Sequence, residues 1–332
     1  MYTVRFTNLK ASFRKPEIDR ICIAFRMDLC PIRERLVASP RLALCVLLYI
    51  LSKPWSLHSA PMFFGRSDSW CSIVFTSVLD YLRDRYAELI VWDPRWLTLQ
   101  QLQRYAEIIS KAGGPDNVWG FVDGTNRGIA RPVEGQEDYY SGYKKHHSIK
   151  FQGLVTPDGL ISHLGGPRLG RIGDWKFWIE SGMPEILAKL FDGVGDAEKL
   201  WVYGDRAYSN SNGVIGAISR IGDRPLTRKE YEHNVAMSQY RISVEWSFGK
   251  VVNLWEHCGY AKGLRVGLQA VGAMYVVAVL LTNVHSCLYG CQVAQYFNTE
   301  PPSLEDYLHV SSTDIRRRST ENPAWSCINK EY

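Results

Sequence analysis

Three acidic residues lie far apart in the chain, each at the end of an apolar segment or on the face of a predicted helix. Asp123 ends the apolar run of VWGFVDGT, Asp205 follows KLWVYG, and Glu245 lies within QYRISVEWSFGKV. If two strands and a helix bring these carboxylates together, their mutual repulsion raises their pKa values. Carboxylate oxygens suit Mg²⁺ or Mn²⁺, and a pair of such ions activates a water and stabilises the leaving oxygen of a phosphodiester. The pattern therefore predicts a metal-dependent nuclease or strand-transfer enzyme, with the three acids as catalytic residues and metal ligands.

Each acid also has an ordinary structural interpretation. An Asp123-Gly124 pair after a strand commonly forms a turn. Glu245 can form an ion pair with Arg241, which precedes it by four residues on the same helix. We expect Arg241 also to orient the Glu245 carboxylate from behind. Asp174 is favoured as a helix N-cap, and it remains a candidate accessory acid.

Basic and aromatic residues follow Asp123 closely. Lys144 and Lys145 open a predicted strand next to several tyrosines, and Arg127 and Arg131 lie on the polar stretch before them. A solvated strand end is the alternative interpretation. Because charge and aromatic rings coincide beside the candidate site, we favour contacts with nucleic-acid phosphates.

The bulk composition is that of a globular protein of about two domains. The chain has 332 residues, of which 46% are hydrophobic and 22% are charged, and its net charge is +5. Such a mild positive charge permits a nucleic-acid partner without demanding one. The eight cysteines form no CxxC pair, so we expect free thiols in a reducing compartment.

The sequence predicts no membrane segment. Residues 1–20 carry charges throughout and lack the long apolar core of a secretory signal. The stretch 266–284 is apolar but is interrupted by glycines, Gln269 and Asn283, so we predict a buried helix of a globular core.

The first part of the chain is predicted to be helical. Within residues 1–114, the segment of about 40–90 has the outline of a helix-turn-helix unit, with a turn at Gly65 before its longest helix. In such a unit the residues after the turn enter the major groove of DNA. A plain three-helix bundle is the favoured alternative, because the turn is the only specific feature.

The pattern changes to alternating strands and helices at about residue 115. A Pro-Asp-Gly turn at 157–159 joins two apolar runs as a hairpin, and further strands end at Asp123 and Asp205. Helices are predicted over 174–191, 229–256 and 265–288. This order indicates an α/β fold, a ribonuclease H-like α/β/α sandwich with a mixed sheet over residues 115–290, preceded by a small all-α domain. Residues 291–332 are predicted to be a polar C-terminal tail.

Several motifs together resemble one known family. The segments VDGTNRGIARP, SGYKKHHSIKFQGLVTPDGLISHLGGP, YGDRAY, RISVEWSFGKV and VGAMYVVAVLLTN are similar to the DDE endonuclease domain of Harbinger-type (PIF/Harbinger) transposases. The resemblance covers about residues 115–290, and the helices of 40–90 are similar to the helix-turn-helix that precedes this domain. Many members carry His where this chain has Asn126.

The resemblance implies Mg²⁺-dependent cleavage of DNA at element ends, followed by joining of the 3′-hydroxyl to target DNA. It carries the catalytic acids onto Asp123, Asp205 and Glu245. It also implies action in the nucleus, a Myb-like DNA-binding protein as partner, and a homo-oligomer as a possible assembly.

Two other functions remain open. A domesticated transposase that binds DNA or regulates without chemistry would keep the same fold, although the presence of all three acids favours an enzyme. A metal-dependent phosphohydrolase of small substrates is disfavoured by the helix-turn-helix-like segment and by the basic residues Lys144 and Lys145.

Overall fold

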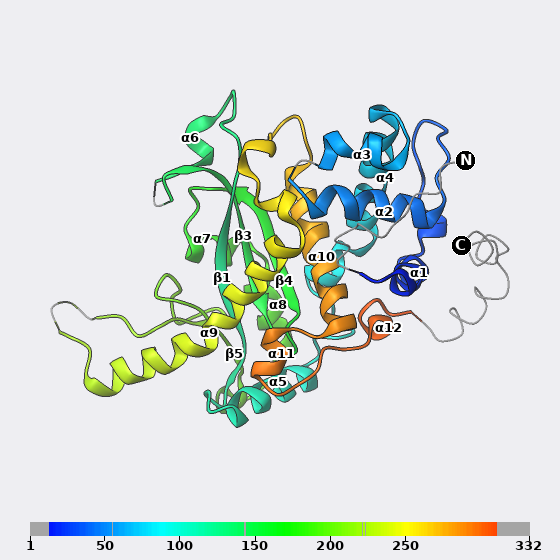
Figure 1. Cartoon of the computed structure of the whole chain (residues 1–332). Helices are drawn as coiled ribbons and strands as arrows, with labels where there is room; N and C mark the ends of the chain where they lie inside the picture. Colours follow the sequence, from blue (N-terminus) through cyan, green and yellow to red (C-terminus); the bar gives the residue numbers. More distant parts are fainter. Residues whose placement is uncertain (1–12, 55, 143, 221, 223, 311–332) are drawn as a thin grey trace. The chain divides into compact units, whose positions relative to one another are not determined.

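The computed structural model describes residues 13–310 except 55, 143, 221 and 223, and the chain divides into two compact units (Figure 1). One unit contains the chain up to Arg85 together with the segment from Pro302 onward. The other unit runs from Tyr86 to Pro301. The predicted domain limits at 115 and 290 remain predictions.

The first unit is helical, as predicted for this part of the chain. Its helices are α1 (Lys15–Ala24), α2 (Pro40–Ser52), α3 (Ser56–Phe64), α4 (Asp68–Tyr86) and α12 (Leu304–Tyr307), with a 3-10 turn η2 (Met27–Leu29). Ser39 caps α2 by accepting the N–H of Leu42 at 3.3 Å, and Pro40 occupies the first helical position. Arg20 of α1 pairs with Glu305 of α12, with Nε 2.6 Å from Oε1. These local signals explain where the helices begin and how the returning chain joins the unit.

The predicted helix, short helix, turn and longer helix of residues 40–90 are present. Gly65 has a φ of +61°, a conformation that glycine adopts without strain. Ser67 then caps α4 by accepting the N–H of Trp70 at 3.2 Å, and the Arg66 guanidinium lies over the Trp70 ring at 5.1 Å. The exposed start of α4 is therefore ordered by its own residues, and its insertion into DNA remains a prediction.

The second unit is built on a mixed sheet. Its strands are β1 (Val118–Gly128), β2 (Tyr140–Ser141), β3 (His146–Val155), β4 (Ile161–Leu169), β5 (Trp201–Tyr203) and β6 (Val214–Ile215). The spatial order is β4-β3-β1-β5-β6, and β2 pairs with the start of β3. The pairs of β3 with β1 and β4 are antiparallel, whereas β5 runs parallel to β1 and β6. This mixed α/β sheet confirms the predicted fold class and is consistent with a ribonuclease H-like fold.

Helices cover both faces of this sheet (Figure 1). On one face are α5 (Leu99–Lys111), α7 (Asp174–Glu180) and α8 (Met183–Leu190), whose apolar side chains enclose Trp119 and Leu154. On the other face are α9 (Arg228–Leu254), α10 (Val271–Tyr289) and α11 (Gln292–Tyr296). There Phe151 packs on Tyr275 with ring centroids 4.4 Å apart. The short elements of the unit are η3 (Ala87–Ile90), α6 (Gln136–Tyr139), η4 (Asp196–Glu198), η5 (Glu256–Gly259) and η6 (Ala261–Gly263).

The apolar helix predicted near residue 270 is α10. Within the described residues it is the one helix whose length and mean hydropathy of 1.7 would suffice to cross a membrane, and 67% of that window is buried inside the protein. It packs against β4 and α9, and Asn283 uses both amide atoms on the backbone of Ile161, each at 3.0 Å. The prediction of a buried helix is confirmed. The helix begins at Val271 instead of Arg265, because residues 265–270 form a loop closed by a bridge between Val266 and Gln269.

One strand end was predicted wrongly. The Asp123-Gly124 pair does not end β1, which continues to Gly128 because residues 124–128 stay paired with Ser148–Gln152 of β3. The predicted hairpin turn lies between β3 and β4, and the residues predicted to be helical over 174–191 form α7 and α8. The seven cysteines of the described part of the chain are free thiols, as expected.

Candidate active site

Two aspartates come to the same level of the sheet on neighbouring strands. Phe121 of β1 pairs with Tyr203 of β5, and the strands are parallel. Asp123 and Asp205 each follow their paired residue by two positions. The carboxylate of Asp205 accepts the N–H of Ala207 at 2.8 Å, which turns the chain away from the sheet. The sheet register therefore places Asp123 and Asp205 at the same level on neighbouring strands, and their role as catalytic residues remains a prediction.

Helix α9 brings the third acid to this point. The helix begins with a capping box, in which Thr227 and Glu230 satisfy each other's backbone N–H groups. Farther along, Phe248 packs over Gly153 of β3, where an added Cβ would lie 2.7 Å from the Phe248 ring. Gly153 is paired with Asp123. This close approach therefore holds the two preceding turns of α9, which carry Arg241 and Glu245, beside Asp123.

Arg241 joins two of the three acids. Its Nη1 donates to Asp123 Oδ2 at 2.8 Å, and its Nη2 donates to Glu245 Oε1 at 3.1 Å. Burial lowers the pKa of Arg241, but the charges of Asp123, Glu245 and Asp205 together raise it above its ordinary value. Asp123 and Glu245 therefore contact the guanidinium directly, whereas Asp205 lines the same cavity as Arg241.

The electrostatics of Asp123 match a carboxylate in a crowded acidic site. Burial raises its pKa to about 6, Arg241 opposes this rise, and the negative charge of Asp205 adds to it. About one fifth of the Asp123 side chain is exposed, compared with 55% of that of Glu245. Asp123 is thus more confined than Glu245, and its negative charge has greater need of a nearby cation.

The donor set fits a hard divalent cation, because Asp123, Asp205 and Glu245 offer oxygen atoms alone. No group of three or more His, Cys, Asp or Glu side chains among the described residues lies close enough to hold a metal ion. Arg241 occupies the space between Asp123 and Glu245. The predicted metal site therefore remains a prediction, and Arg241 is the cation at this point in the structure.

Asp174 lies on the opposite face of the sheet. It is the first residue of α7, so the predicted N-cap position belongs to Gly173, and Asp174 pairs with Lys150 of β3, whose Nζ is 2.9 Å from Asp174 Oδ1. Gly124 makes this approach possible, because an added Cβ would collide with the Asp174 carboxylate. On the same face, Gln152 donates to the backbone oxygen of Asp174 at 3.0 Å. Asp174 adds a weak repulsion to Asp123 through the strand, and its direct partner is Lys150.

Asn126 stands where many members of the resembling family carry His, and it lies on the same face of the sheet as Asp174. Its amide donates to Ser148 Oγ at 3.0 Å and to the Gly170 backbone oxygen at 3.4 Å. It fastens β1 to β3 and to the loop after β4, away from Asp123 and Arg241.

The predicted phosphate-binding residues lie in different environments. Arg127 is half-buried, donates to Thr125, and lies over the Tyr275 ring at 5.4 Å. Arg131 is exposed and donates to Gln136 at 2.7 Å. Lys144 and Lys145 are exposed on the turn between β2 and β3. Nucleic-acid binding by these four residues remains a prediction, and packing already occupies Arg127.

The structure adds residues that sequence reasoning missed. A cavity of about 360 Å³ is lined by Asp205 and Arg241 together with Arg206, Asn234 and Tyr231. The signal was present, because Arg206 directly follows the second aspartate. Tyr231 was missed because it lies far from Asp123 and Asp205 along the chain.

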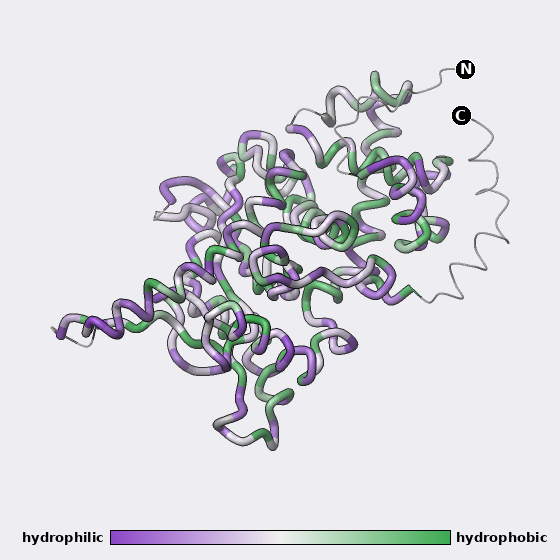
Figure 2. The backbone as a smooth tube through the Cα atoms, turned by 60° about the horizontal axis from the view of Figure 1, so that its bottom comes forward, coloured by the Kyte–Doolittle hydropathy of each residue, from purple (hydrophilic) through white to green (hydrophobic). Residues whose placement is uncertain are grey.

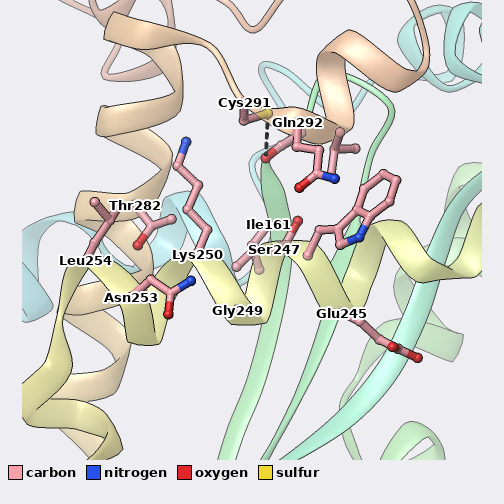
Figure 3. A pocket seen from close by; sticks show the side chains of 13 residues that line it. Ile161, Glu245, Ser247, Gly249, Lys250, Asn253, Leu254, Thr282, Cys291 and Gln292 are labelled. Atoms are coloured by element: carbon pink, nitrogen blue, oxygen red, sulfur yellow. Dashed lines mark hydrogen bonds between the residues drawn. The ribbon is translucent and has the colours of Figure 1, made fainter.

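A second cavity, of about 420 Å³, lies along α9 beyond Glu245. Figure 3 shows the side chains of Glu245 and Lys250 leaving the helix in different directions. Lys250 donates to Ser286 Oγ at 2.9 Å and to the Gly290 backbone oxygen at 3.1 Å, which ties α9 to the end of α10. Burial lowers the pKa of Lys250. Glu245 lines one end of this cavity, and the two hydrogen bonds of Lys250 hold α9 against the end of α10.

A ribonuclease H-like sheet with acids on β1, after β5 and on the following helix defines a class of enzymes that cleave or transfer phosphodiesters. Comparison with protein families agrees, because residues 122–283 match the model described as DDE superfamily endonuclease. The matched segment contains all three acids, Asp123, Asp205 and Glu245. No curated protein and no solved structure matches the chain.

Proposed function

We propose that the chain is a metal-dependent DNA endonuclease of transposase type, which cuts phosphodiester bonds at transposon ends and joins the 3′-hydroxyl to target DNA. The observation that carries the proposal is that Arg241 pairs with both Asp123 and Glu245 and lines one cavity together with Asp205. DDE superfamily endonucleases normally use divalent metals, and the domain implies a DNA substrate. We further propose the Harbinger subtype, action in the nucleus, a Myb-like partner and a homo-oligomer, on the sequence resemblance alone.

Each of the three acids has its own expected role. Asp123 and Asp205 are the residues that would hold Mg²⁺ or Mn²⁺, and Glu245 would complete the set. When bound, the metal supplies the activation of water and the stabilisation of the leaving oxygen. Arg241 orients the carboxylates of Asp123 and Glu245, and it compensates their charge. The partial burial of Asp123 strengthens its own charge interactions, because the surrounding dielectric constant is lower than that of water.

A nicking assay tests the proposal. The wild-type chain with Mg²⁺ or Mn²⁺ is expected to convert supercoiled plasmid to nicked circles, and a chelator is expected to stop it. Asp205→Asn should lower the rate at least about a hundredfold, since a neutral amide holds a divalent cation less well than a carboxylate and the cation supplies the activation. Asp196→Asn is the matched control, because Asp196 is a surface aspartate with 96% of its side chain exposed. Nicking by Asp205→Asn at the wild-type rate would contradict the assignment.

One observation favours a second function. Arg241 already compensates Asp123 and Glu245, and no three-ligand cluster exists in the described part of the chain. A catalytically silent descendant that binds DNA or regulates would fit this arrangement. DNA binding by a wild-type protein that fails to nick with either metal would support it.

A further inference from the structure

A groove of basic residues leads away from the acids. The cavity of about 360 Å³ beside Asp205 shares Arg206 and Tyr231 with a neighbouring cavity of about 610 Å³. Because Arg206 and Tyr231 line both cavities, the two cavities lie side by side, and together they are called the groove here. Both volumes are within the range of ligand sites in proteins. The groove therefore joins the candidate active site to the segment that precedes α9.

The outer part of the groove is positively charged. The residues that line it are Arg206, Ser219, Arg220, Pro225, Leu226, Arg228 and Tyr231. None of these described lining residues is acidic. Arg228 is 91% exposed and pairs with Glu232 along the helix, whereas Arg206 and Arg220 form no ion pair with any carboxylate of the described residues. Three arginines around one cavity repel each other, and a polyanion would remove that repulsion.

The shape of α9 supports a polymer as the occupant. Figure 1 shows the N-terminal half of α9 projecting from its unit, and Figure 2 shows this half as mostly hydrophilic. Tyr231 lies on it with 61% of its surface exposed. An exposed ring next to arginines is a typical stacking surface for the sugars and bases of nucleic acids, whose backbone the arginines contact.

We propose that this groove binds the DNA backbone leading to the scissile phosphate, with Arg206 nearest to the bond that is cut and Arg220 and Arg228 on phosphates farther along. This inference rests on the proposed cleavage of DNA at Asp123 and Asp205. It adds a binding site between β5 and α9, distinct from the exposed lysines before β3. Because phosphate contacts carry no sequence information, the groove positions DNA and does not select its sequence.

Fluorescence anisotropy with a labelled duplex and Ca²⁺ in place of Mg²⁺ measures binding without relying on cleavage. The double variant Arg220→Ala/Arg228→Ala is expected to bind at least about tenfold more weakly at moderate salt. Its plot of log affinity against log salt should be shallower by about 1.8, since each lost phosphate contact on duplex DNA removes about 0.9. Arg104→Ala/Lys111→Ala on α5 removes the same charge away from the groove and should leave both quantities unchanged.

Further variants separate the possible explanations. Arg220→Lys/Arg228→Lys keeps the charges and should restore the salt slope, which a folding defect would not do. If the double alanine variant kept the wild-type affinity and salt slope, the proposal that the groove binds DNA would be overturned. Displacement of DNA by inorganic phosphate more effectively than by chloride at equal ionic strength would also overturn it, in favour of a small-anion site. If Asp205→Asn binds DNA normally and the wild type binds but does not nick, the proposed cleavage fails while the groove stands.

Discussion

Arg241 is the residue on which the chemistry of the site depends. Its guanidinium satisfies Asp123 and Glu245 at 2.8 and 3.1 Å, in the place where a bound cation would be expected to act. Either a divalent ion or the Arg241 guanidinium can therefore compensate the negative charge of Asp123. The arginine keeps the metal-free acids compatible with the fold, at the expense of metal affinity.

Arg241→Gln tests this balance directly. Without metal the variant should be less stable than the wild type by about 2 kcal/mol, because Asp123 loses its counterion while remaining largely buried. It should bind Mn²⁺ about tenfold more tightly, since an uncompensated carboxylate pair gains more from the ion. Urea unfolding and calorimetric titration measure the two effects.

Arg228→Gln provides the control for this comparison. Arg228 also pairs with a glutamate four residues away on α9, but it is 91% exposed, so neither stability nor Mn²⁺ affinity should change measurably. If Mn²⁺ bound Arg241→Gln no better than the wild type, the guanidinium and the metal would not share the same carboxylates.

The acids themselves were predictable from the sequence, and their electrostatic partners only in part. Asp123 and Asp205 both follow short apolar strands, which is a local pattern. The pairing of Arg241 with Glu245 follows from helical spacing. The pairing of Arg241 with Asp123 depends on Gly153, which allows α9 to approach the sheet closely. No local sequence pattern predicts that contact. The groove escaped prediction for the same reason, since β5 and α9 meet only in the folded chain.

At the scale of elements, the edge strand β4 depends on two buried polar side chains. Asn283 of α10 holds the backbone of Ile161, and His163 places Nδ1 2.6 Å from the Val91 backbone oxygen after η3. Burial lowers the pKa of His163 to about 4. The folded protein therefore keeps this histidine neutral.

This burial predicts a loss of stability in acid. An unfolded histidine takes up a proton near pH 6.5, whereas folded His163 does so only near pH 4, so the unfolded state binds more protons between these values. Its contribution is full above pH 6.5 and falls as the pH is lowered, by up to about 3 kcal/mol in total. Urea unfolding at pH 7.5, 6 and 5 should show His163→Phe losing less stability than the wild type over this range. Parallel curves for the two proteins would contradict the prediction.

The elements of the sheet were mostly predictable, and their exact limits were not. Short apolar runs indicated β1, β3 and β4, and the Thr156-Pro157-Asp158-Gly159 turn indicated the hairpin between β3 and β4. The continuation of β1 past Asp123 was missed, because Asp-Gly is a turn sequence by itself and only pairing with β3 keeps it extended. Tertiary pairing overrode a local preference at this point.

At the scale of the whole molecule, the core of the second unit extends beyond the segment that matches the endonuclease family. Leu102 and Tyr105 of α5 are buried with Trp119, and Tyr105 donates to Asp158 of the hairpin turn. After α10, Phe297 stacks on Phe121 with ring centroids 5.9 Å apart. Segments on both sides of residues 122–283 thus complete the two faces of the sheet.

Two fragments test which limits describe a folding unit. Residues 86–301 should unfold in one cooperative urea transition, seen alike by circular dichroism and tryptophan fluorescence. Residues 115–290 should lack such a transition, because they lose α5 and Phe297. Each large buried side chain removed costs about 3 kcal/mol or more, and three such losses approach the whole stability of an ordinary domain, about 5–15 kcal/mol. Equal urea midpoints for the two fragments would mean that α5 and Phe297 contribute little to the stability of the sheet. A cooperative transition confined to 86–301 would make these flanking segments part of the machinery that holds Asp123 in place.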